Sequence, residues 1–261
     1  MSGFYTLFSG SSGNCTFISD GRTNLLVDAG VSAARIAEAL AKIGIHPSEI
    51  HGILVTHEHR DHILGVGTLS RNYSIPVYAT SATMEKAMTV TGWIFDDNIH
   101  VFNANEKFGV GDIEVFSFST SHDAVDSVGY TFRFGGNYYS VATDMGCVTD
   151  VVLKHLCKSK AVLIESNHDV EMLKNGPYPY HLKQRILGRR GHLSNEHASL
   201  LAAQLVKWGA ENIVLGHLSE KNNTPDIAYN TTAECFAAND IKIGKDVNLT
   251  VAPADGICHI V

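Results

Sequence analysis

A histidine-rich segment follows a short apolar run in the first quarter of the chain. The run Ile53–Val55 predicts a buried strand, and His57, His59, Asp61 and His62 come directly after it. Residues two apart in an extended chain point to the same side, so His57 and His59 can bind one cation together. Asp61 and His62 are adjacent, so at least one of them must point away from the cation that His57 and His59 bind. A second cation beside the first could use both of them as ligands. The spacing therefore predicts a site for two metal ions.

The alternative interpretation of this segment is a polar surface loop that binds nothing. Histidine and aspartate at ligand spacing directly after a strand are typical of a metal site, and we prefer the metal site for that reason. Glu58 and Arg60 alternate with the candidate ligands. We expect both of them to be solvated loop charges.

Four further predicted strands end in polar residues that could ligate metals: His122, Asp144, His168 and His217. A carboxylate such as Asp144 can bridge two metals because each oxygen can bind one, although it could instead cap the helix expected over 148–157. One metal would take His57, His59 and His122, the other would take Asp61, His62 and His217, and Asp144 would bridge them. Such a pair of metals polarises a substrate and provides a hydroxide at neutral pH.

Two residues are candidates for contacts that support the ligands. Asp28 ends the apolar run Leu25–Val27. It could hold a ligand histidine from behind, cap the helix expected over 32–43, or do both. His168 follows the strand expected over 161–164, where it could support a ligand or simply bond to the backbone. The residues leave both alternatives open.

A basic run in an otherwise acidic chain is the candidate for anion binding. Four basic residues fall within eight positions: Lys183, Arg185, Arg189 and Arg190. Such a run is usually a solvated helix face, but its place directly before His192 makes anion binding an equal alternative. Residues 175–181, rich in proline and tyrosine, predict a loop before it. Ser194 or Asn195 is expected to cap a helix over 196–208.

Composition and charge limit the class of protein. The chain has 261 residues, of which 44% are hydrophobic and 18% charged, as in an ordinary globular protein. Its net charge of −7 argues against a surface that coats nucleic acid broadly, but not against a local basic groove. No apolar run approaches the roughly 18 residues of a membrane helix, and the N-terminus shows no signal peptide. Five cysteines form no C-x-x-C pair, so we expect free thiols, a cytoplasmic location and no membrane partner.

The order of the predicted elements indicates the fold class. Residues 3–30 alternate short apolar runs with turns, which predicts a β-meander. Its turn over 9–14 could bind phosphate through backbone amides, but a plain hairpin loop is favoured. A coarse duplication suggests a single domain over 1–261 with two halves, about 1–120 and 121–261. We expect an α/β (α+β) fold with two mixed sheets that face each other and helices outside.

The ligand pattern resembles that of the metallo-β-lactamase superfamily: His57-x-His59-x-Asp61-His62, His122, Asp144 and His217. The resemblance covers nearly the whole chain and implies the superfamily's αββα four-layer sandwich. True β-lactamases usually lack the histidine after the aspartate and often have a cysteine ligand. Diiron flavoproteins usually have glutamate at the place of His59, so neither class fits. The pair Asp61-His62 is similar to that of glyoxalase-type thioesterases, phosphodiesterases and nucleases.

The second half narrows the resemblance to one branch. It looks like the YycJ/WalJ branch in the segments Glu165–Asp169, Tyr178-Pro179, Leu182–Ile186, Gly191–Asn195 and Gly216–Asn223. That branch implies a bacterial cytoplasmic nuclease with a 5′-to-3′ exonuclease activity on DNA. The segment Gly191–Ser194 is also similar to the histidine loop of tRNA 3′-processing nucleases. There the histidine equivalent to His192 serves the scissile phosphate.

We therefore expect a dinuclear phosphodiesterase that uses two divalent ions, Zn²⁺, Mn²⁺ or Fe, and most simply a 5′-to-3′ DNA exonuclease. Asp61 would orient a metal-bridging hydroxide. His192 would donate a proton or hold the phosphate, since the ordinary pKa of histidine, about 6.5, suits either role. Flanking phosphates would bind Lys183, Arg185, Arg189, Arg190 and Ser194. DNA is favoured over RNA as the partner. The alternatives are a ribonuclease, a cyclic-nucleotide phosphodiesterase, a glyoxalase-II-type thioester hydrolase and a regulator on an inactive scaffold.

Overall fold

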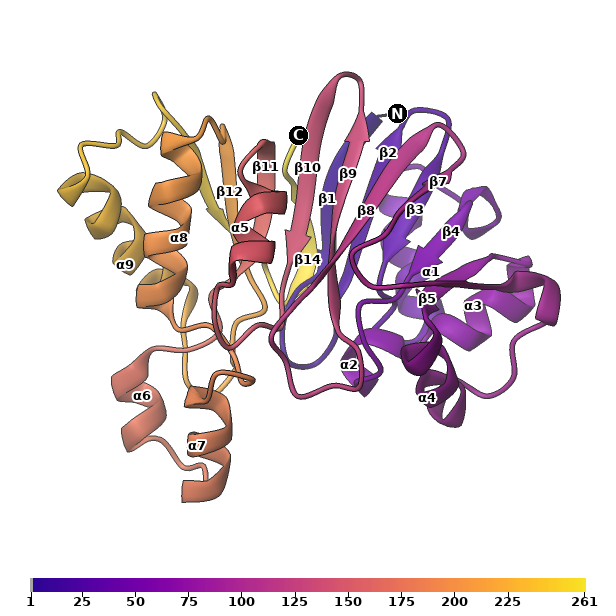
Figure 1. Cartoon of the computed structure of the whole chain (residues 1–261), viewed down its shortest axis with the longest axis horizontal. Helices are drawn as coiled ribbons and strands as arrows, with labels where there is room; N and C mark the ends of the chain where they lie inside the picture. The colour runs from indigo at the N-terminus through magenta and orange to yellow at the C-terminus, as the bar shows by residue number, and fades with distance from the viewer. Residues whose placement is uncertain (1) are drawn as a thin grey trace.

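Two seven-stranded sheets form the centre of the molecule in the computed structural model, which describes residues 2–261. In its spatial order the first sheet contains β14 (Asp255–His259), β1 (Ser2–Phe8), β2 (Cys15–Asp20), β3 (Asn24–Val27), β4 (Gly52–Leu54), β5 (Val77–Thr80) and β6 (Ile99–Phe102). The second contains β13 (Asn248–Val251), β12 (Asn212–Gly216), β11 (Ser159–Glu165), β10 (Asn137–Ala142), β9 (Val128–Phe134), β8 (Ile113–Ser119) and β7 (Lys107–Val110). The two sheets face each other and helices lie outside them, so the predicted four-layer sandwich is confirmed (Figure 1).

Three apolar clusters fill the three interfaces of this sandwich. Phe4, Leu25 and Tyr130 belong to the cluster between the sheets. A second cluster joins the first sheet to its helices, and a third joins the second sheet to its own. Burial of apolar surface is the main driving force of folding, and each sheet buries both of its faces. This explains why strands such as β3 and β11 are apolar without alternation.

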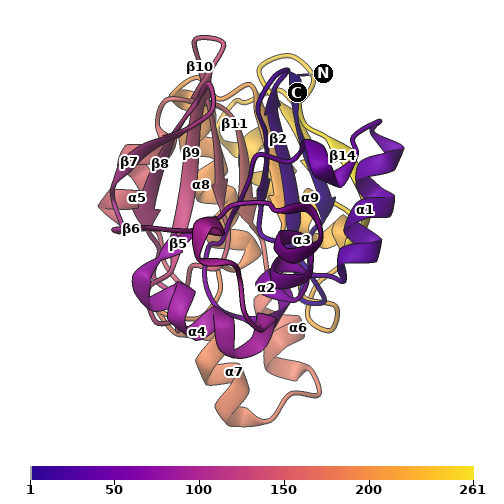
Figure 2. The ribbon, with the colours of Figure 1, turned by 90° about the vertical axis from the view of Figure 1, so that its right-hand side faces the viewer.

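Helices lie on the outer faces of both sheets, and several of them begin at a residue whose side chain caps the helix. The first sheet is covered by α1 (Ala33–Lys42), α2 (Arg60–Ile63), α3 (Val66–Tyr73) and α4 (Ser81–Thr91), and the second by α5 (Asp150–Leu156), α8 (Asn195–Lys207) and α9 (Pro225–Ala238) (Figures 1 and 2). Ser32 caps α1, Thr149 caps α5 and Ser194 caps α8 through side-chain oxygens that accept backbone N–H groups. Thr80 caps α4 in the same way, by accepting the Thr83 N–H.

The structure departs from the sequence-based expectation in several segments. The histidine-rich segment leads into two short helices, α2 and α3, which are separated at Leu64–Gly65, and β7 was not predicted. The segment expected as a loop over 175–181 joins two helices, α6 (Val170–Asn175) and α7 (Tyr180–Leu187), which project from the body as a hairpin (Figure 1). The chain passes from the first sheet to the second between Phe102 and Lys107, before residue 120, and β14 returns to the first sheet.

The parallel part of each sheet points its strand ends toward one end of the sandwich. β3, β4, β5 and β6 are parallel neighbours, as are β10, β11, β12 and β13. The loops after the carboxyl ends of parallel strands lie at one edge of a sheet, which is where α/β proteins bind ligands. Within residues 2–261, no helix has the length and apolar character needed to cross a membrane. The five cysteines are free thiols, as predicted.

Candidate metal centre

Three of the segments that follow strands hold a site residue in an unusual backbone conformation. Asp28 after β3, Asp144 after β10 and His217 after β12 have φ angles of 61°, 56° and 55°. Residues other than glycine rarely adopt this left-handed region. Such conformations persist where surrounding contacts hold them, and they cluster at functional sites. The three residues therefore mark the end of the sandwich where a site is expected.

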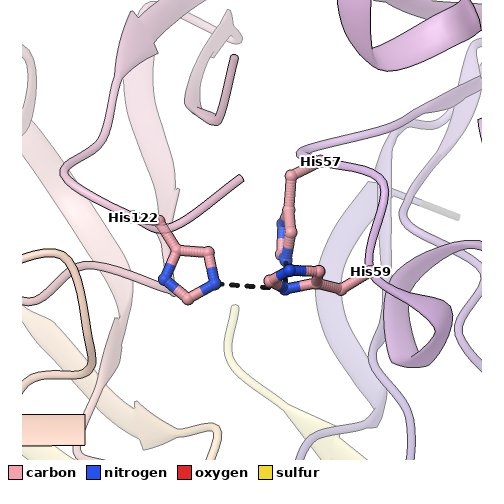
Figure 3. Close-up of side chains that lie close together, drawn as sticks. All are labelled: His57, His59 and His122. Atoms are coloured by element: carbon pink, nitrogen blue, oxygen red, sulfur yellow. Dashed lines mark hydrogen bonds between the residues drawn. The ribbon is translucent and has the colours of Figure 1, made fainter. Parts of the chain in front are cut away.

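Three histidines form the first cluster (Figure 3). His59 Nδ1 lies 3.0 Å from His57 Nε2 and 3.2 Å from His122 Nε2. The outer Nδ1 of His57 lies 2.9 Å from Thr56 Oγ1, and that of His122 lies 3.0 Å from the carbonyl oxygen of Gly191. Because the Thr56 hydroxyl donates its own proton to a carboxylate, both outer nitrogens carry the ring proton and both Nε2 atoms present lone pairs. Lone pairs that converge in this way suit a bound cation.

Asp61, His62 and His217 form the second cluster, and Asp144 lies between the two. Asp144 Oδ2 lies 3.3 Å from His62 Nε2, and Asp144 Oδ1 lies 3.6 Å from His217 Nε2 and 3.8 Å from His122 Nε2. Asp61 Oδ2 lies 3.5 Å from His62 Nε2 and 3.7 Å from His217 Nε2. The seven predicted ligands are therefore brought together, and the Asp144 carboxylate reaches both clusters. Thr149, and not Asp144, caps α5.

Two buried carboxylates hold histidines of the second cluster from behind. Asp28 Oδ2 accepts a hydrogen bond from His62 Nδ1 at 2.7 Å, and Glu165 Oε1 accepts one from His217 Nδ1 at 2.9 Å. Each bond fixes the ring proton on Nδ1 and leaves Nε2 directed at the cluster. Asp28 thus makes the supporting contact that the sequence suggested, whereas the alternative cap of α1 is Ser32.

Sequence reasoning did not assign Glu165 to the site. Its side chain is fully buried, and its second oxygen accepts backbone N–H groups from Met145 at 2.9 Å and Leu193 at 3.1 Å. Its first oxygen also accepts from His192 Nδ1 at 2.7 Å. Glu165 could have been identified from its place at the end of an apolar strand, which is the feature that identified Asp28. Glu165 connects a metal-site histidine to the residue predicted to act on the substrate.

Unpaired atoms and local charge at the centre of the site fit a bound cation. Asp144 Oδ2 and His217 Nε2 are buried and have no hydrogen-bond partner among the residues that the structure describes. Burial lowers the pKa of His217, but Asp144, Asp61 and Glu165 outweigh it and raise the pKa to about 10. Burial raises the pKa of Asp61, but His62 and His217 hold it well below its ordinary value. Surroundings that favour positive charge so strongly also favour a divalent metal ion, so the residues fit metal binding.

A polar cleft of about 360 Å³ opens onto these clusters. It is lined by His59, Asp61, Asp144 and His217 from the metal clusters and by His192. The His192 side chain is 19% exposed, and its Nδ1 lies 3.8 Å from Asp144 Oδ1. With Nδ1 bonded to Glu165, Nε2 is the nitrogen left to meet a substrate. The structure therefore places His192 beside the metal clusters, as its predicted role requires.

The basic run is engaged mainly within the protein. Lys183 Nζ donates to the carbonyl oxygen of Lys174, and Arg185 forms an ion pair with Asp123. Arg190 Nε donates to the carbonyl oxygen of His122 at 3.0 Å, so it holds the loop that carries a ligand.

Arg185 alone of this run lines the cleft, and Arg189 is exposed away from it. Ser194 is buried and accepts the His197 N–H as the cap of α8, so its hydroxyl does not serve the cleft.

Two further expectations from the sequence, one for Glu58 and one for His168, are wrong. Glu58 is not a solvated charge, because its Oε1 accepts the Val125 N–H at 3.0 Å and joins the loop after β4 to the loop after β8. His168 is 1% exposed, and neither ring nitrogen has a hydrogen-bond partner between residues 2 and 261. Its ring therefore supports no ligand and bonds to no backbone group. Burial lowers the pKa of His168 to about 4.

Comparisons with known proteins agree with this architecture. The beta-lactamase superfamily domain matches residues 23–218. The chain is 40% identical over 243 residues to exodeoxyribonuclease WalJ of Streptococcus pneumoniae, covering 92% of this chain and 90% of the relative. It is 37% identical over 242 residues to exodeoxyribonuclease YycJ of Bacillus anthracis, covering 93% and 92%.

Among solved structures, the metallo-β-lactamase fold protein YhfI of Bacillus subtilis has the same fold. Its TM-score is 0.71 at 16% identity, and the match covers 98% of this chain and 99% of that protein. The family match, the curated relatives and the ligand clusters agree. The chain therefore belongs to the metallo-β-lactamase superfamily, as a metal-dependent hydrolase of the branch that contains WalJ and YycJ.

Proposed function

We propose that this protein is a dinuclear metal-dependent phosphodiesterase that degrades DNA as a 5′-to-3′ exonuclease. The relatives from Streptococcus pneumoniae and Bacillus anthracis are both named exodeoxyribonucleases, and each is matched over at least 90% of its length. The 5′-to-3′ direction is the one that the resemblance to this branch implies. A nuclease also needs positive charge near its metals, and the cleft has two arginines, Arg60 and Arg185.

One observation carries the proposal: a single cleft contains the metal ligands, a histidine that is not needed as a ligand, and cationic side chains. Phosphodiester cleavage needs an attacking water, neutralisation of charge on the phosphate and a proton for the departing oxygen. Two divalent metals, when bound, would activate the water and neutralise much of the charge. His57, His59 and His122 would hold one of them, and Asp61, His62, His217 and the bridging Asp144 would hold the other.

The remaining work falls to side chains that line the cleft. Asp61, with 29% of its side chain exposed, can accept a hydrogen bond from the attacking water and orient it. His192 can hold a proton at Nε2 and donate it to the departing oxygen, because the bond from its Nδ1 to Glu165 orients the ring in the cleft. Arg185 can contact a flanking phosphate at the rim, although it must share its guanidinium with Asp123.

The test is the degradation of end-labelled duplex DNA and single-stranded RNA side by side, with Zn²⁺ or Mn²⁺ added and metal content measured. Stepwise shortening of DNA from the 5′ end, lost in His59→Ala, is the expected result. Degradation of RNA alone would replace the proposal with a ribonuclease. Two bound metals without activity on either polymer would point to a small phosphodiester or a thioester as the substrate.

A further inference from the structure

The cleft over the metal clusters has two walls that come from different parts of the fold. One wall is formed by Ser11, from the turn between β1 and β2, and by Arg60, the first residue of α2. The other is formed by the α6–α7 hairpin, through Tyr178 and Leu182. In Figure 1 the hairpin projects below the second sheet and α2 lies below the first. Residues from both walls line the same cleft as the candidate ligands His59, Asp61, Asp144 and His217.

Arg60 is a cation with no partner in the protein. Across residues 2–261 its side chain forms no hydrogen bond and no ion pair, and it is exposed at the mouth of the cleft. By contrast, Arg185 is paired with Asp123, and Arg190 is bonded to backbone carbonyls. A guanidinium free to form two parallel hydrogen bonds suits a phosphate. Among residues 2–261, Arg60 is therefore the unpaired cation that lines the cleft, and it lies outside the basic run.

Tyr178 is an aromatic side chain with an unused face. It is half-buried in the cleft wall, yet no hydrogen bond or ring contact involves it in the described part of the chain. Pro177 and Pro179 flank it, and proline fixes its own backbone φ angle. The residue before a proline is also confined to extended conformations. The backbone at Tyr178 is thus restricted on a short connection between two helices, while the ring face stays open in the cleft wall, which suits stacking on a planar ligand.

The size of the cleft limits what can lie between these two walls. Its volume of about 360 Å³ falls at the lower end of the range for small-molecule sites, about 300–1,000 Å³. One nucleotide unit has suitable dimensions, whereas a base pair with both backbones does not. Proteins that bind single strands combine a cationic groove with aromatic side chains on which bases stack. Arg60 and Tyr178 offer one of each beside the metal ligands.

We propose that Arg60 and Tyr178 form a subsite for one nucleotide of a single strand, in which Tyr178 stacks on the base and Arg60 binds the adjacent phosphate. The subsite admits the strand end to the metals one nucleotide at a time and selects an unpaired end over a paired one. Both residues are positioning residues and take no part in bond cleavage. This inference rests on the proposed function, because it presumes a nucleic-acid substrate.

The experiment measures binding of a fluorescein-labelled single-stranded oligonucleotide by anisotropy, in the metal-loaded His192→Ala background so that little substrate is cleaved. Tyr178→Ala is expected to weaken binding about 5- to 100-fold, the range that loss of one stacked base produces. Tyr178→Phe is expected to bind like the parent, because it keeps the ring face. Arg60→Ala is expected to reduce the slope of log Kd against log salt by about 0.7, the value for one phosphate contact.

Two matched variants serve as controls. Tyr180→Ala removes a tyrosine of the same hairpin that is 77% exposed and does not line the cleft. Arg22→Ala removes an arginine with 86% side-chain exposure in the turn between β2 and β3. If Tyr178→Ala and Arg60→Ala behave like these controls while the wild-type protein binds and degrades DNA, the subsite is refuted and the proposed function stands. If Tyr178→Phe binds as weakly as Tyr178→Ala, stacking is refuted. If the wild-type protein neither binds nor degrades DNA, the proposed function itself fails.

Discussion

Glu165→Gln is the substitution that tests the architecture of the site most directly. The Glu165 carboxylate accepts hydrogen bonds from the His192 and His217 rings at 2.7 and 2.9 Å and from two backbone N–H groups at 2.9 and 3.1 Å. An amide of the same shape has one accepting oxygen, and its NH₂ group can only donate. In Glu165→Gln, either the two rings or the two backbone groups therefore face a donor.

The expected loss follows from these four contacts. A hydrogen bond to a charged group contributes roughly 1.5–3 kcal/mol, so two lost bonds correspond to about 3–6 kcal/mol. The lower end is the better expectation, because the substitution also removes the repulsion between Glu165 and the buried Asp144. If the rings lose their acceptor, His217 also becomes a weaker ligand. Losses of such supporting contacts typically reduce metal affinity 10- to 100-fold.

The assay is denaturant unfolding of the metal-free protein, followed by competition with a chelator to measure metal affinity. Glu196→Gln, at an exposed position in the first turn of α8, is the control and should match the wild type. An unfolding free energy within about 0.5 kcal/mol of the wild type, together with unchanged metal affinity, would refute this account of Glu165. Lower stability with unchanged metal affinity would mean that the amide oxygen stays with the two rings.

Two further changes test other parts of the site, and two test the stability of the fold. His59→Ala should lose both bound metal and hydrolysis, and metal analysis beside the activity assay checks this; retention of both ions would exclude His59 as a ligand. His192→Ala should keep its metal but lose most turnover, about 100-fold or more if it acts as general acid; full turnover would remove that role. His168 has a pKa of about 4 in the folded state against 6.5 unfolded, so it stabilises the protein above pH 6.5 and this contribution is lost as the pH falls toward 4. His168→Phe should therefore make the metal-free protein less acid-sensitive by about 3 kcal/mol over that interval, and equal pH profiles in denaturant titrations would contradict this. Gly30→Ala should destabilise by more than about 3 kcal/mol, because a β-carbon there would clash with the carbonyl oxygen of Asp61; a melting temperature equal to that of the wild type would exclude the clash.

The clustering of the seven candidate ligands could be predicted because each of them carries a local signal. Four of the seven lie within six residues after an apolar run, and the other three each follow a predicted strand. The carboxyl ends of parallel strands lie at one edge of a sheet whatever the details of packing. The type of each residue and its position after a strand were therefore sufficient to predict that these side chains lie close together. His192 was instead indicated by the resemblance of Gly191–Ser194 to the histidine loop of tRNA 3′-processing nucleases. Glu165, which connects His192 to His217, is harder to identify from the sequence, because a single carboxylate after an apolar strand is compatible with several roles.

The charged residues at the rim show where sequence reasoning fails. For the run from Lys183 to Arg190 the sequence leaves anion binding and a solvated helix face as equal alternatives, and for Arg60 it predicts a solvated charge. In the structure most of the run is bonded to the protein itself, whereas Arg60 is unpaired and lines the cleft. Whether a cation is free depends on carbonyls and carboxylates from distant segments, such as Asp123 for Arg185. Spacing along the chain contains no information about those partners.

The sequence by itself therefore determined the four-layer fold, the end of the sandwich where the site lies and the chemical types of its ligands. These properties depend on apolar periodicity and on strand ends, which are local or follow from general rules of sheet geometry. Only the tertiary structure decided which ring nitrogens face inward, which carboxylates hold them, and that the α6–α7 hairpin forms a wall of the cleft. Those properties depend on contacts between residues far apart in the chain, such as Asp28 with His62 and Glu165 with His217. Such contacts form only when the two sheets pack together.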